Sequence, residues 1–86
     1  MKREEILAAA ADIISGDRQE DYGDWSDNAE DIASMWSVIL GSNVSARQVG
    51  LCMIALKMVR LKRGPHHEDS FVDICGYAAL GGESDD

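Results

Sequence analysis

The segment spanning residues 46–63 restricts the fold more than any other part of this chain. Almost every side chain between Val49 and Leu61 is apolar, and the polar exceptions are Lys57 and Arg60. A helix that is apolar on nearly every side is buried by other helices or by another subunit. The sequence therefore predicts a helix at the centre of a helical core or of a subunit interface.

Local start and stop signals divide the chain into four helices. Ser45 and Gln48 resemble a capping box before the apolar segment, and Gly64 with Pro65 ends it. The other segments show apolar residues at helical spacing, and nowhere do apolar and polar residues alternate as in a strand. The predicted fold class is all-α, a four-helix antiparallel bundle. The predicted helices are residues 3–15, 27–40, 46–63 and 68–80. Asp27 and Glu30 resemble a capping box at the start of the second helix, and Gly41 ends that helix. Residues 1–80 are predicted to form the domain, and residues 81–86 an acidic flexible tail.

The size of the chain limits the core that these helices can form. Its 86 residues make one small domain with only five aromatic side chains, so the core is thin. A thin core beside an apolar helix predicts a homo-oligomer whose interface completes the core. Cys52 and Cys75 lie in apolar helical runs, and we expect them to be reduced core residues.

Net charge excludes several classes of partner. Sixteen acidic residues against eight Lys and Arg give a formal charge of −8, which disfavours binding to a nucleic-acid polymer or an anionic membrane. The five bases of residues 42–63 lie between two acidic segments of the sequence. Cations and phosphates could bind where the basic and acidic segments face each other, or the charges could simply be solvated on separate faces of the protein. Acidic residues interrupt the first apolar stretch, so we expect neither a signal peptide nor a membrane span, and place the protein in the cytoplasm.

Lys57 and Arg60 are three residues apart and share one side of their helix. Burying two unpaired cations is costly, so carboxylates must lie nearby, and the last helix offers Asp69 and Asp73, with Tyr77 one turn further along. One interpretation is a pair of interhelical ion pairs. The other is a polar pocket in which the carboxylates hold Mg²⁺ and the cations hold phosphate.

A second acidic edge opens the second helix, where Asp27, Glu30 and Asp31 lie within little more than one turn. These carboxylates could contribute to a Mg²⁺ site, or they could simply favour the helix dipole. His66 and His67 are adjacent and lack the spacing of a structural zinc site, so we interpret them as a loop pair.

Aromatic residues accompany a cation in the polar segment between the first two helices. Tyr22 and Trp25 lie near Arg18, where they could stack on a nucleobase, or they could cap the end of the bundle. No phosphate-binding glycine loop, nucleophile elbow or paired-histidine zinc motif occurs, so nothing in the sequence supports covalent nucleophilic catalysis.

Five short motifs together look like those of a family of small phage and prophage proteins of unassigned function. The resemblance spans about residues 5–80. The motifs are Ile13-Ile14-x-Gly16-Asp17-Arg18, Asp21-Tyr22-Gly23-Asp24, Ile32-Ala33-x-x-Trp36, Lys57-x-x-Arg60-Leu61 and Asp69-Ser70-Phe71-x-Asp73-Ile74-x-Gly76-Tyr77.

More distantly, the Asp-Tyr-Gly loop and the last two motifs are similar to nucleotide-modification-associated and MazG-like proteins, the all-α nucleoside triphosphate pyrophosphatases. This resemblance implies Mg²⁺-dependent hydrolysis of a nucleotide to its monophosphate and pyrophosphate by metal-activated water. The family signature pairs E-x-x-E with E-x-x-D, whereas here the last helix spaces its two acids one residue wider. The alternatives are a non-catalytic protein that sequesters a nucleotide, or a helical interaction module whose charges are structural. The implied roles are catalysis by Asp69, Asp73 and Lys57, Mg²⁺ binding by Asp69, Asp73, Asp31 and Glu30, and nucleotide binding by Arg18, Tyr22, Trp25, Arg60 and Tyr77.

Overall fold

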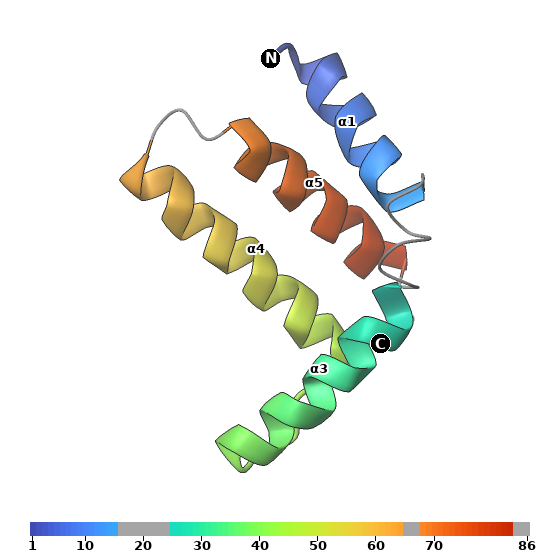
Figure 1. The fold of residues 1–86 in the computed structure, drawn as a ribbon, viewed down its shortest axis with the longest axis vertical. Coiled ribbons are helices and arrows are strands. Elements are labelled where there is room, and N and C mark those ends of the chain that lie inside the picture. The colour runs from blue at the N-terminus through green and yellow to red at the C-terminus, as the bar shows by residue number, and fades with distance from the viewer. Residues whose placement is uncertain (16–24, 65–67, 84–86) are drawn as a thin grey trace.

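The chain is seen here in a computed structural model that describes residues 1–15, 25–64 and 68–83. Four α-helices account for most of these residues, and no strand occurs among them, which confirms the all-α fold class (Figure 1). The helices are α1 (Arg3–Ser15), α3 (Trp25–Leu40), α4 (Ala46–Arg63) and α5 (Glu68–Glu83).

Local sequence signals fix both ends of α4, as predicted. The Ser45 hydroxyl accepts a hydrogen bond from the Gln48 backbone N–H at 3.1 Å. The Gln48 side-chain oxygen accepts one in return from the Ser45 backbone N–H at 2.9 Å, which completes the capping box. At the other end the Gly64 N–H donates to the Arg60 carbonyl at 2.9 Å. The bounds of α1 and α4 match the sequence prediction.

Two other predicted boundaries are wrong. Helix α3 begins at Trp25, two residues before the predicted start, so Asp27 lies inside the first turn and does not cap the helix. Helix α5 continues past residue 80 to Glu83, although glycines occupy positions 81 and 82. A glycine lowers helix propensity by only about 1 kcal/mol, so glycines near an end do not by themselves stop a helix. Gly41, by contrast, does end α3, with a left-handed φ of 69°.

The helices form an open row with one inclined helix. In Figure 1, α5 lies between α1 and α4, while α3 packs against the start of α4 and points away from the row. Helices α4 and α5 are antiparallel as predicted, whereas α1 runs in the same direction as α5. The arrangement therefore differs from a closed antiparallel bundle. The radius of gyration of 13.6 Å exceeds the value of about 12 Å that is typical of a compact domain of this length.

One serine joins the connection between α3 and α4 to the body of α3. The Ser37 hydroxyl donates to the Ala33 carbonyl at 2.7 Å and accepts from the Val44 backbone N–H at 2.9 Å. Both bonds are partly buried, so they satisfy a loop N–H that would otherwise have little access to water.

The core is as thin as the sequence predicted, but α4 does not lie at its centre. The buried apolar side chains of the described ranges are all small, namely Ala10, Ala29, Ala33, Val49 and Val72, and the buried polar side chain Ser70 is small as well. Helix α4 stands at the edge of the row, and its outward side chains remain half exposed or more. Of the two alternatives that the sequence left open for covering α4, complete burial by other helices of the same chain is therefore not what the structure shows. The prediction of a core position is wrong for one of the two cysteines, Cys52, which is exposed; Cys75 is half-buried, and neither thiol forms a disulfide.

Candidate functional site

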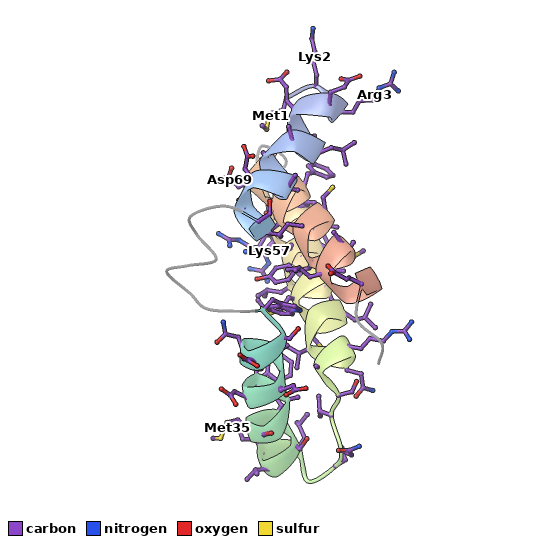
Figure 2. The ribbon with its side chains drawn as sticks, turned by 90° about the vertical axis from the view of Figure 1, so that its right-hand side faces the viewer. Met1, Lys2, Arg3, Met35, Lys57 and Asp69 are labelled. Carbon is purple, nitrogen blue, oxygen red and sulfur yellow. The ribbon has the colours of Figure 1, made fainter. Side chains whose placement is uncertain are left out.

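The best-defined polar feature is an ion pair between the two antiparallel helices α4 and α5. Lys57 Nζ lies 3.1 Å from Asp73 Oδ2, and the two side chains are only 14% and 29% exposed. Figure 2 shows Lys57 in the middle of the molecule, where α4 and α5 run side by side. One of the two predicted interhelical ion pairs is thus present. We call this region the α4–α5 seam and define it by Lys57, Arg60, Asp69 and Asp73.

The second predicted ion pair is not formed. Arg60 and Asp69 are both exposed, and within the described ranges no ion pair joins them. Arg60 lies one turn beyond Lys57 but is rotated about 60° around the helix, which directs it towards the edge of the seam. The seam therefore has one internally neutralised charge pair and two charges of opposite sign at its surface.

The predicted Mg²⁺ ligands lie on different helices. Glu30 and Asp31 are exposed on α3, whereas Asp69 and Asp73 lie one turn apart on α5. Across the part of the chain that the structure describes, no group of three or more His, Cys, Asp or Glu side chains is placed to hold a metal ion. The structure thus brings Asp69 and Asp73 into one region without adding Glu30 or Asp31 to them. Magnesium binding stays a prediction.

An aromatic pair lies one helical turn from the ion pair. The rings of Trp25 and Tyr77 have centroids 5.3 Å apart and are tilted by 59°, and such pairs contribute about 0.5–1.5 kcal/mol beyond their buried area. Trp25 also lies close to α4, as shown by the distance of 3.7 Å between the Trp25 ring and the position that a Cβ atom would take at Gly50. Trp25 therefore connects the start of α3 to both α4 and α5.

Gly50 is a positioning residue that the sequence analysis missed. It is buried on α4 next to the Trp25 ring, where a large side chain would compete with that ring for space. The available signal was a glycine inside an otherwise apolar helix, which often marks a close approach of another element.

Two of the candidate nucleotide-binding residues and the two histidines lie outside the described ranges. They are Arg18, Tyr22, His66 and His67. Of the helices described, none is long and apolar enough to cross a bilayer.

These features define a small all-α protein with a polar seam between two helices. Residues 5–85 match the family described as Domain of unknown function (DUF6378), and the chain therefore belongs to that family. The chain is 41% identical over 76 residues to the Gene 55 protein of Mycobacterium phage L5, which covers 87% of this chain and 49% of that relative. It is 40% identical over 75 residues to the Gene 55 protein of Mycobacterium phage D29, with 87% and 50% covered.

These matches confirm the resemblance to a family of phage proteins of unassigned function. The chain spans about half the length of the curated relatives it matches. No solved structure matches the chain.

Proposed function

We propose that this phage protein binds a nucleotide at the α4–α5 seam, in the cytoplasm of the host cell. The observation that carries the proposal is the half-buried Lys57–Asp73 pair beside the Trp25–Tyr77 pair, with Arg60 exposed on the next turn of α4. A cation held by a carboxylate at a helix junction is already ordered, and a second cation at the edge is open to an incoming anion. Phosphate is the anion that suits this pair of bases.

The surrounding residues suit the remaining parts of a nucleotide. Tyr77 lies four residues after Asp73, about 6 Å along α5, so an aromatic surface adjoins the charged one. A base that stacks on this surface would place its phosphates towards Lys57 and Arg60. Arg18 and Tyr22 precede Trp25 in the sequence and are the further contacts we propose.

Hydrolysis of the bound triphosphate is a second candidate function. It is favoured by Asp69 and Asp73, which lie one turn apart on α5 and offer two carboxylates to Mg²⁺, an ion that usually keeps several waters and takes few protein ligands. Waters would complete the coordination of the ion, because Glu30 and Asp31 lie on α3 and the structure does not bring them to this pair. In such an enzyme, metal-activated water would be the nucleophile, and the products would be a monophosphate and pyrophosphate.

Thermal unfolding with a panel of ribonucleoside and deoxyribonucleoside triphosphates, with and without Mg²⁺, tests the binding proposal. A ligand present at 100 times its Kd adds about 2.7 kcal/mol to the free energy of unfolding, which raises the Tm of a domain this small by roughly 10 °C or more. Arg60→Gln should abolish the shift. Lys62→Gln, the same charge change on the opposite side of α4, is the matched control and should leave the shift intact.

Pyrophosphate release in the same mixtures separates the two candidates. Asp69→Asn is the informative variant because Asp69 is exposed and makes no ion pair with the described residues, so its loss does not disturb the Lys57–Asp73 contact. Binding without release of pyrophosphate supports the sequestering protein. Release that Asp69→Asn abolishes supports the enzyme. If no nucleotide shifts the Tm, the seam is structural and the nucleotide proposal is wrong.

A further inference from the structure

The outward side of α4 carries a regular row of exposed apolar residues. Leu51, Ala55 and Met58 follow one another at intervals of four and three residues, which places them along one side of the helix. Cys52 and Val59 flank this row. Leu51 is 56% exposed and Met58 59%, so these side chains contact little within the chain. We call these five residues the α4 outer face.

The α4 outer face lies away from the α4–α5 seam. Val49 and Gly50, which are buried, and Lys57, which pairs with Asp73, occupy the opposite side of the same helix. The outer face is therefore not an extension of the candidate site. Its alternating spacing of three and four residues is the pattern by which two helices pack along a shared seam.

The exposed area of the chain is consistent with an uncovered interface. The chain exposes 6321 Å², whereas a folded monomer of this mass exposes about 5,000 Å². The excess of roughly 1,300 Å² is not confined to α4, because Val38 and Ile39 on α3 are exposed too, but it is large enough to include the 800 Å² or so that each partner buries in a standard interface. The thin core and the exposed α4 are thus explained together if a second protein surface covers this helix.

Independently of the nucleotide proposal, we propose that a second copy of this chain covers the α4 outer face, with the two α4 helices antiparallel and a two-fold axis near Ala55. The face suits a copy of itself, because in this register Leu51 of each chain lies opposite Val59 of the other and the small Ala55 side chains meet at the axis. Close approach of the two backbones is easiest at the alanine.

Charge favours the antiparallel direction, although this register also sets Arg47 of one copy opposite Arg63 of the other. Lys62 and Arg63 end α4, and a parallel pair would place four of these bases side by side. The antiparallel pair moves the two basic ends to opposite sides of the axis, about 20 Å apart along the helices, which is well beyond the Debye length of about 8 Å at physiological salt. It also sets the two helix dipoles in opposite directions.

Light scattering coupled to size exclusion, over a dilution series of the full chain, tests the pairing. We expect a mass of about 19 kDa, twice the 9.4 kDa of one chain. Leu51→Glu and Met58→Glu should each reduce the mass to that of one chain. Leu7→Glu changes a similarly exposed apolar residue on α1 and should leave the mass of the wild-type chain. A wild-type chain that stays monomeric throughout, or a Leu51→Glu variant that stays dimeric, would overturn the proposal.

Disulfide trapping tests the register even if the charged variants unfold. In a Cys52→Ser, Cys75→Ser background, Ala55→Cys should form an intermolecular disulfide under mild oxidation, because the two-fold axis brings the two positions together. Cys52 alone, in a Cys75→Ser background, should not form an intermolecular disulfide, since the antiparallel register separates the Cys52 residues of the two chains by about 9 Å along the helices. Equal cross-linking at both positions would indicate a parallel pair and would overturn the antiparallel arrangement. No cross-link at position 55 would contradict it as well.

Discussion

Replacing Asp73 with asparagine removes one charge from the α4–α5 seam while keeping the shape of the side chain. Lys57 then keeps a full positive charge at a site where only 14% of its side chain is exposed. Water reaches it poorly, and within the described ranges no ion pair is seen for it other than the one to Asp73. We therefore expect Asp73→Asn to destabilise the protein through an uncompensated charge and not through lost packing.

The expected size of the effect follows from the exposure of the pair. Breaking a fully buried pair costs about 3–5 kcal/mol, whereas exposed pairs contribute about 0.2–1 kcal/mol. With side chains 14% and 29% exposed, this pair is intermediate, and Asp73→Asn should cost roughly 2 kcal/mol. That corresponds to a fall in Tm of about 8–16 °C for a domain of this size. Lys57→Met should cost less, because the Asp73 side chain, which then keeps an unpaired charge, is more exposed than the Lys57 side chain.

A double-mutant cycle with Lys57→Met and Asp73→Asn, followed by circular dichroism during urea unfolding, measures the pair itself. All variants must be compared at one protein concentration, because self-association would make the apparent stability depend on it. The double variant should lose about 1–2 kcal/mol less than the sum of the single variants. The matched control is the cycle of Arg60→Met with Asp69→Asn, which should be additive. Additivity at Lys57 and Asp73 as well would refute the energetic role of the seam.

Substitutions at three further positions test how the site is held in place. Gly50→Ala should stabilise the protein by about 0.5–1 kcal/mol through helix propensity, since its Cβ would meet the Trp25 ring at an ordinary 3.7 Å; Gly50→Leu should destabilise it by about 1–3 kcal/mol and alter the tryptophan emission. Ser45→Ala removes half of the capping box of α4 and should cost about 1 kcal/mol in urea unfolding. Ser37→Ala leaves the partly buried Val44 N–H without its acceptor and should cost about 1–3 kcal/mol; unchanged hydrogen exchange at Val44 would contradict the role of this hydroxyl.

Local signals were sufficient to predict most helix boundaries. Ser45 with Gln48, and Gly41 with its left-handed backbone, are contacts within one turn of a helix, so the residues that decide them are adjacent in the sequence. The error at Asp27 has the opposite cause. Trp25 starts α3 two residues early, where its ring packs against Tyr77, more than fifty residues away in the chain. A tertiary contact of this kind leaves no local signature.

The candidate site was predictable in its residues and only partly in its pairing. Two cations and two carboxylates at helical spacing predicted ion pairs between α4 and α5, and the Lys57–Asp73 pair confirms one of them. The rotation and offset of α4 and α5 relative to each other keep Arg60 and Asp69 from forming the second ion pair. Those quantities depend on how all the helices pack, and spacing within a single helix does not determine them.

The apolar sequence of α4 indicates that the helix is covered but does not identify what covers it. Burial by the same chain and burial by another subunit require the same composition, so the structure was needed to show that α3 and α5 cover only one side. Lys57 on that side and Ala55 on the other are two residues apart, about 200° around the helix. One helix can therefore present a charged site on one side and a self-association surface on the other, because neither set of residues competes with the other for space. The two proposals consequently stand or fail separately, since Arg60 belongs only to the first and Leu51 only to the second.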